Sequence, residues 1–215
     1  MFHVKQPPPP TLSRLPDCAP PDAAQQAMLD AYLDLLMRWN SRINLVADAP
    51  PETLRQRHIR DCLQLAALVP PGDGPMADLG AGAGLPGLVL AIATGRPIHL
   101  VESDRRKAAF LTEAAARLDL KRVKVHPTRI EDATLPPLAL ITARALAPLD
   151  RLLPHAARLL APGGIAIFPK GRTAEAELAA TLPAWTCQVE RFASQTDPEA
   201  TIFRLSDIRH ASPEA

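Results

Sequence analysis

Apolar residues in the first third of the chain recur at the spacing of an amphipathic helix. Spacings of three and four join Met28, Tyr32, the pair Leu35 and Leu36, and Trp39. The pattern predicts one helix with Asp22 as its N-cap and its end near Asn40. A second helix should begin at Pro51, a residue that suits a first helical turn, and run to about Ala67. We therefore expect a helical extension over residues 23–70.

Beyond residue 70, short apolar strands alternate with helical segments. The expected strands are Met76–Leu79, Ile98–Glu102, Val123–His126, Leu138–Ala143, Ile165–Pro169, Thr186–Phe192 and Thr201–Leu205. The expected helices are Gly87–Ala93, Asp104–Leu118, Asp150–Leu160 and Thr173–Leu182. This alternation is typical of α/β domains with a doubly wound, mostly parallel, Rossmann-like sheet, here seven-stranded over residues 71–215. No convincing helix separates the last two strands, so we expect them to pair antiparallel at one edge.

The N-terminal segment differs from both regions in composition. Residues 1–22 are rich in proline, including the run Pro7–Pro10, which favours an extended, poorly packed arm. No apolar run reaches the ~18 residues that a membrane helix needs. The first residues also lack the apolar core of a signal peptide. A cytoplasmic protein is the expectation.

The net charge of +1 gives no argument for nucleic-acid binding, but the distribution of charge along the chain is uneven. Between Asp104 and Arg129 there are eight Lys or Arg residues against three acids. Such an excess is usually a solvated helix face, and it indicates an RNA-binding surface only with support from other features. Three scattered cysteines, Cys18, Cys62 and Cys187, show no metal-binding spacing, so no metal is expected.

A glycine-rich loop, Asp78-Leu-Gly80-Ala-Gly82-Ala-Gly84-Leu85-Pro86-Gly87, lies between the first strand and the first helix of the predicted sheet. It holds four of the chain's ten glycines. Glycine allows positive φ and leaves no Cβ to block a ligand. In a doubly wound sheet this turn opens at the carboxyl ends of the strands, the usual ligand crevice. The loop therefore predicts a nucleotide cofactor.

Glu102 supplies the second part of this pattern. It ends the next apolar strand, 22 residues after Gly80. A carboxylate at that distance can accept hydrogen bonds from both hydroxyls of a cofactor ribose. We predict this role for Glu102.

The identity of the cofactor rests on further residues. Gly82-x-Gly84-x-x-Gly87 also matches the dinucleotide pattern, so a nicotinamide-dependent small-molecule oxidoreductase is the alternative. Against it, Asp78 at the strand end is typical of methyltransferase loops. The sole tyrosine, Tyr32, precedes the loop and has no lysine four residues on, and too few residues follow for a separate substrate domain. The loop thus favours S-adenosylmethionine, with S-adenosylhomocysteine as product, and Asp78 and Gly82 are counted among its contacts.

Several separated motifs resemble those of the bacterial small-subunit rRNA methyltransferase G family, also called glucose-inhibited division protein B. They are Trp39-Asn-x-x-Ile43-Asn44-Leu45, Arg57-His-Ile-Arg-Asp61-Cys62, the loop with its Leu85-Pro86-Gly87 ending, Arg129-Ile-Glu131-Asp, Ala143-Arg144-Ala145 and Lys170-Gly171. The resemblance runs from about Leu29 to Leu205. It departs from the family pattern at Arg60 and Cys62.

The resemblance implies a class I methyltransferase that methylates N7 of guanine 527 in the 530 loop of 16S rRNA, within the small ribosomal subunit. It implies cofactor contacts from Gly80, Leu85, Ile130, Glu131 and Arg144. Our candidates for the rim that grips the RNA are Arg144 with Lys170, and Arg57. Guanine N7 carries no proton, so no general base is expected. A non-enzymatic RNA-binding regulator stays a further alternative, although a pure binder has no use for both the loop and Glu102.

Overall fold

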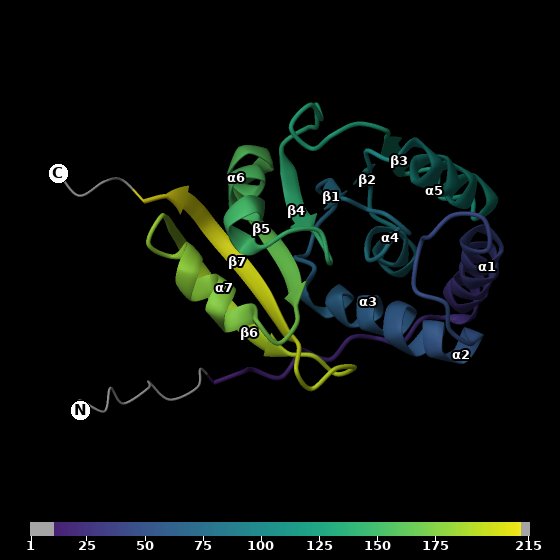
Figure 1. Cartoon of the computed structure of the whole chain (residues 1–215), viewed down its shortest axis with the longest axis horizontal. Helices are drawn as coiled ribbons and strands as arrows, with labels where there is room; N and C mark the ends of the chain where they lie inside the picture. Colours follow the sequence, from purple (N-terminus) through teal and green to yellow (C-terminus); the bar gives the residue numbers. More distant parts are fainter. Residues whose placement is uncertain (1–10, 212–215) are drawn as a thin grey trace.

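The computed structural model describes residues 11–211 and centres on one seven-stranded sheet, with strand order β3-β2-β1-β4-β5-β7-β6 (Figure 1). Its strands are β1 (Met76–Leu79), β2 (Ile98–Val101), β3 (Val123–His126), β4 (Leu138–Thr142), β5 (Leu160–Lys170), β6 (Trp185–Ala193) and β7 (Thr201–His210). The first five strands are parallel, and β7 pairs antiparallel with both β5 and β6. This confirms the predicted fold class and the antiparallel edge.

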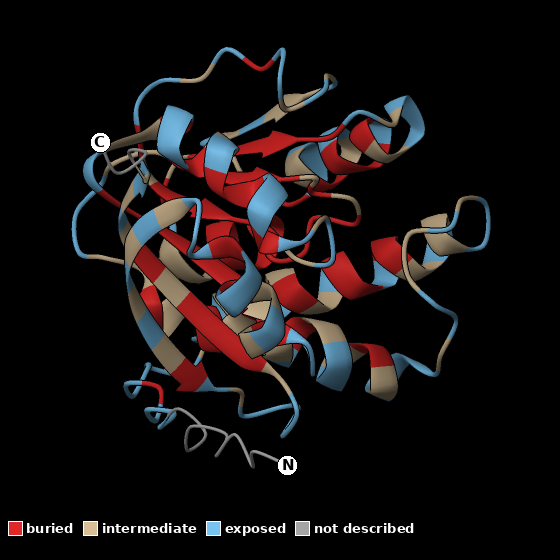
Figure 2. Cartoon of the chain, turned by 60° about the vertical axis from the view of Figure 1, so that its left-hand side comes forward, coloured by how far each residue is buried: buried red, intermediate tan, exposed pale blue. Residues whose placement is uncertain are grey.

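Helices cover both faces of the sheet, as the strand pattern requires. One apolar cluster joins alternate strand residues to α1 (Ala23–Asn40), α4 (Gly87–Thr94) and α5 (Arg105–Arg117). The other cluster joins the opposite side chains to α6 (Leu149–Leu159) and α7 (Ala174–Thr181). Figure 2 shows the result, with buried helix faces turned towards the sheet and exposed faces turned outward. The central parallel strands β1, β2 and β4 are buried on nearly every residue, which explains why they read as short, mostly apolar runs. The edge strand β3 is only partly buried.

The N-terminal extension is helical as predicted, but its second part is irregular. Asp22 caps α1 in a reciprocal capping box with Gln25. The second segment begins with α2 (Pro51–Leu54), passes through a π-helical stretch (Arg55–Arg60) and α3 (Asp61–Leu63), and ends in a 3₁₀ turn (Gln64–Leu68). Such π-helical insertions occur often at functional sites, and this one carries most of the Arg57–Cys62 motif.

Two strands are longer than their apolar patterns indicate. We expected β5 to begin at Ile165, yet it begins at Leu160, which pairs with Leu138 across an irregularity in the ladder. Gly163, with φ of 76°, lets the backbone continue through a segment that reads as a turn. β7 likewise extends to His210, where its pairing with Trp185 of β6 completes the ladder. Pairing between strands, and not local composition, sets these boundaries.

Part of the predicted proline-rich arm lies against the sheet. Residues 1–10 are outside the described residues. Ser13 forms a bridge with Phe192 of β6, and Leu15 is buried in the first apolar cluster. The arm is thus packed at these two positions. That the rest of it is extended and poorly packed stays a prediction. None of the helices within residues 11–211 is both long and apolar enough to span a membrane.

Candidate active site

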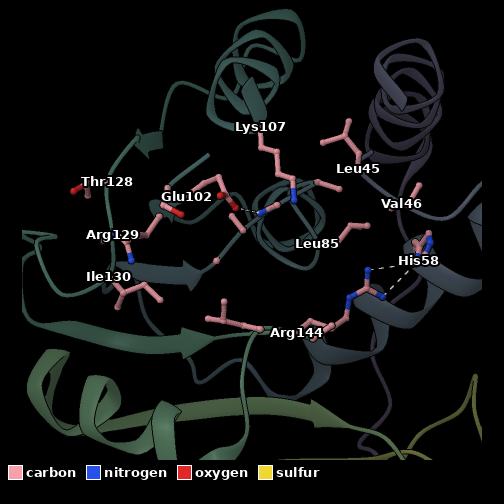
Figure 3. Close-up of a pocket in the computed structure, with 18 of the residues that line it drawn as sticks. Leu45, Val46, His58, Leu85, Glu102, Lys107, Thr128, Arg129, Ile130 and Arg144 are labelled. Atoms are coloured by element: carbon pink, nitrogen blue, oxygen red, sulfur yellow. Dashed lines mark hydrogen bonds between the residues drawn. The ribbon is translucent and has the colours of Figure 1, made fainter. Parts of the chain in front are cut away.

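A cavity of about 580 Å³ opens at the carboxyl ends of β1 to β4, and we call it the first cavity (Figure 3). Seven of the predicted cofactor residues line it: Gly80, Gly82, Leu85, Glu102, Ile130, Glu131 and Arg144. The loop, the strand-end acid and the segments after β3 and β4 are therefore brought together as the topology requires.

Asp78 is the one predicted contact that does not line the first cavity. Its side chain is buried beneath the loop, where one carboxylate oxygen accepts from the Gly87 N–H at 2.9 Å and the other from Thr142 Oγ1 at 2.9 Å. A Cβ added to Gly87 would lie 2.8 Å from that first oxygen. Asp78 thus ties the far end of the loop to β4. The sequence placed Asp78 correctly at the loop. It also predicted a direct contact with the cofactor, but Asp78 is not among the residues that line the cavity.

Burial raises the pKa of Asp78 to about 7, despite its two hydrogen bonds, from an ordinary value of 3.8. Between those pH values the folded chain keeps a proton that the unfolded chain has released, so this carboxyl group stabilises the fold less as the pH rises. The unfolding free energy of the wild type minus that of Asp78→Asn should therefore fall from about pH 4 to about pH 7 and level off above. Urea unfolding at closely spaced pH values measures this difference in unfolding free energy. A difference that stays constant with pH would contradict the raised pKa of Asp78.

Glu102 is held in place by backbone donors on both of its oxygens. Oε2 accepts from the Gly82 N–H and Oε1 from the Asp104 N–H, each at 2.8 Å. The side chain is buried yet still lines the first cavity. These bonds fix the carboxylate against the loop and leave each oxygen with acceptor capacity towards the cavity. Two neighbouring hydroxyls of a ribose match this arrangement.

The N-terminal extension closes the opposite wall with residues that the sequence reasoning missed. Leu45 and Val46 line the first cavity, and their N–H groups both donate to Asn40 Oδ1 at 2.9 Å. Tyr32 of α1 is fully buried and donates its hydroxyl to the Ala83 carbonyl oxygen of the loop at 2.5 Å. The Trp39-Asn40 to Leu45 motif was the available signal, because an Asn at a helix end commonly organises the following turn.

Arg144 joins the sheet to the π-helical segment. Its guanidinium donates to Asp61 Oδ2 at 3.1 Å and reaches His58 Nδ1 at 3.3 and 3.4 Å (Figure 3). Burial first, and Arg144 second, lower the pKa of His58. A neutral imidazole with Nδ1 as acceptor fits this geometry, since an arginine donates only. Arg144 is thus joined to the Arg57–Cys62 motif at one rim of the cavity.

A second cavity, of about 920 Å³, adjoins the first across the segment that follows β4. All three RNA candidates, Arg57, Arg144 and Lys170, line it. Besides Arg144, whose partners are given above, Arg57 and Lys170 differ in whether their charge is already bound to the protein. Arg57 is exposed, whereas the Lys170 ammonium donates to the Ala147 carbonyl oxygen at 2.6 Å and pairs with Glu177 at 3.0 Å. Lys170 therefore anchors the segment after β4, and Arg57 is the freer cation.

The predicted basic surface between Asp104 and Arg129 is divided by the fold. Arg105 to Lys107 begin α5 at the cavity edge of the sheet, and Lys107 and Arg129 line the first cavity. Lys121 to Lys124 lie where β3 begins, at the opposite edge, and Arg122 is paired with Asp73 at 2.7 Å. Only the first group is positioned to accompany a ligand at the cavities.

The residues of the first cavity fit S-adenosylmethionine. Glu102 offers acceptors for a ribose, and Leu85, Val101 and Ile130 offer apolar walls for an adenine. Positive φ at Gly80 and Gly82 keeps the loop backbone close to the cavity without side chains in the way. Across residues 11–211, no group of three or more His, Cys, Asp or Glu side chains could hold a metal ion.

Comparisons with known proteins agree on one family. The family model for rRNA small subunit methyltransferase G matches residues 25–200. The chain is 49% identical to Ribosomal RNA small subunit methyltransferase G of Granulibacter bethesdensis over 215 residues, covering 97% of this chain and 99% of that protein. It is 54% identical to the protein of the same name from Acidiphilium cryptum over 189 residues, 86% of each chain.

A solved structure extends the likeness in fold. An O-methyltransferase from Bacillus cereus, in complex with SAH, matches with a TM-score of 0.56 at 16% identity, covering 86% of this chain and 97% of that chain. At this identity the likeness concerns the architecture alone. The sequence matches reach further, because they span both the helical extension and the sheet. This chain belongs to the rRNA small subunit methyltransferase G family.

Proposed function

We propose that the protein transfers a methyl group from S-adenosylmethionine to N7 of one guanine in the 530 loop of 16S rRNA. The observation that carries the proposal is the pair of adjoining cavities. The first has the loop and Glu102 suited to the cofactor, and the second opens beside it with Arg57 at its rim. Family membership makes the chain a methyltransferase and removes support from the nicotinamide alternative.

The chemistry asks little of acid or base groups. In the transfer, the N7 lone pair forms the new N–CH₃ bond while the electrons of the S–CH₃ bond stay on sulfur, so the positive charge moves to the guanine and no proton is released. The chain's own residues then act by positioning, which in well-oriented reactions lowers the barrier by about 7–11 kcal/mol. Glu102 orients the cofactor in the first cavity. The segment after β4, which lies between the two cavities, orients the reacting groups.

The RNA should reach the site as an unpaired or splayed nucleotide. In A-form RNA the deep, narrow major groove hides N7 from side chains. Arg57, Lys107 and Arg129 lie around the cavity mouths and would neutralise its phosphates, with strongly salt-dependent binding. We place the reaction on the small ribosomal subunit in the cytoplasm.

The test uses purified protein with methyl-labelled S-adenosylmethionine. The substrates are transcribed 16S rRNA, small subunits reconstituted with it, and tRNA. Label should appear in 16S rRNA as 7-methylguanosine at one position, and the better of the two 16S substrates identifies the natural one. Label confined to tRNA or protein would refute the proposal. RNA binding without any methyl transfer would instead support the alternative of a non-enzymatic RNA-binding regulator.

A further inference from the structure

An exposed leucine stands between the two cavities. Among residues 11–211, large apolar side chains are exposed at Leu12, Leu146 and Leu182, each 39% exposed. Leu146 alone of these three lines a cavity described above, and it lines both of them. Single exposed apolar side chains are ordinary on the outside of a protein, but one in a cavity wall is available to a bound ligand. The exposed position of Leu146 is not explained by packing of the hydrophobic core.

The segment that carries Leu146 is held rigidly at both ends. On one side Arg144 is bound to Asp61 and His58. On the other, the Ala147 carbonyl oxygen accepts from Lys170 at 2.6 Å. Between them Ala145 adopts φ of 53°, in the left-handed region that alanine rarely occupies. Such backbone strain persists where surrounding contacts enforce it, and it clusters at functional sites.

Leu146 also lies directly against the glycine loop. A Cβ built on Gly80 would be 2.5 Å from Leu146 Cδ1 and 3.0 Å from Cδ2. The missing side chain at Gly80 therefore gives Leu146 its space. The leucine is placed at the junction where a methyl donor in the first cavity would face an acceptor in the second.

We propose that Leu146 packs against the flat face of the target guanine and aligns its N7 with the first cavity. This inference rests on the proposed function. A base drawn out of its RNA fold loses its stacking partners, and an apolar side chain can replace part of that contact. The polar edges of the base remain free for neighbouring groups, while the rigid segment sets the plane of the ring.

The test compares Leu146→Ala with Leu182→Ala, a matched control that is equally exposed and lies at the end of α7. With small subunits reconstituted from transcribed 16S rRNA, Leu146→Ala should lower kcat/KM about tenfold, since burying the exposed part of this leucine against the base would contribute about that much. Leu146→Met should retain most of the activity because it keeps an apolar contact. Leu182→Ala should match the wild type, and all three variants should keep the wild-type melting temperature.

Two binding measurements separate this role from others. In Leu146→Ala, the dissociation constant of S-adenosylhomocysteine, measured by calorimetry, should rise much less than kcat/KM falls. Affinity for the subunits in the presence of S-adenosylhomocysteine should fall. A cofactor affinity that falls as far as kcat/KM would overturn the inference, as would wild-type kcat/KM in Leu146→Ala. Failure of the wild type to methylate 16S rRNA would instead sink the proposed function.

Discussion

Glu102→Gln is expected to raise the dissociation constant of S-adenosylmethionine about tenfold to a hundredfold, because hydrogen bonds to charged groups contribute about 1.5–3 kcal/mol each. The carboxylate accepts from Gly82 and Asp104 and faces the cavity with its remaining lone pairs. A glutamine keeps the size but puts an NH₂ group against one of these N–H donors. Calorimetric titration with the cofactor and its demethylated product gives the two affinities.

Glu131→Gln is the matched control for this change. Glu131 lines the same cavity, yet its side chain is 66% exposed and lies 3.7 Å from His155 Nε2. Glu131 is itself a predicted cofactor contact. After β3, however, a backbone N–H and the apolar side chain of Ile130 can hold an adenine, and the substitution preserves both. Equal losses in both variants would show a general charge effect, and an unchanged affinity in Glu102→Gln would count against the ribose role.

Arg144→Ala is expected to reduce methyl transfer about a hundredfold, since a misplacement of about 1 Å near the reacting groups can cost that much. It should also destabilise the fold by about 3 kcal/mol, because removing one partner of a buried ion pair leaves the other charge unpaired. The side chains of Arg144 and its partner Asp61 are only 19% and 18% exposed. Single-turnover kinetics and urea unfolding measure the two effects.

Two further variants make the Arg144 result specific. Arg144→Lys keeps the charge, but one ammonium cannot reproduce the fork that reaches both Asp61 and His58, so its activity should be intermediate. Arg122→Ala removes an ion pair of 2.7 Å with both partners exposed, at the opposite edge of the sheet. It should alter stability by about 1 kcal/mol or less. Arg144→Ala with full activity would exclude a part for this rim in the reaction.

The sequence predicted most of the architecture because the relevant signals are local. Alternating apolar strands and helices give a parallel sheet, and the glycine loop must then open at its carboxyl edge. Glu102 could be predicted as a ribose contact because it ends the next apolar strand, 22 residues after Gly80. These inferences depend on neighbours in the chain, so one sequence suffices for them.

Other features depend on residues far apart in the chain. Asp78 reads as a cofactor contact, but its carboxylate is buried beneath the loop and does not line the first cavity. It is bound there to Gly87 and to Thr142, which is 64 residues away. Lys170 reads as a free cation at a strand end, yet it is bound to Ala147 and Glu177. A local pattern shows which side chains reach an edge and cannot show which of them are already satisfied there.

The glycine loop, the strand-end acid and the family motifs could therefore be identified from the sequence. One motif includes Leu45, but its sequence did not show that Leu45 and Val46 form a wall of the first cavity. Nor did the sequence show the position of Leu146 between the cavities, which needs Gly80, Arg144 and Lys170 to be brought around it. Hydrophobic periodicity encodes which face of an element is buried. The direction in which an exposed side chain points is set by long-range packing and hydrogen bonds, and these exist only once the chain has folded.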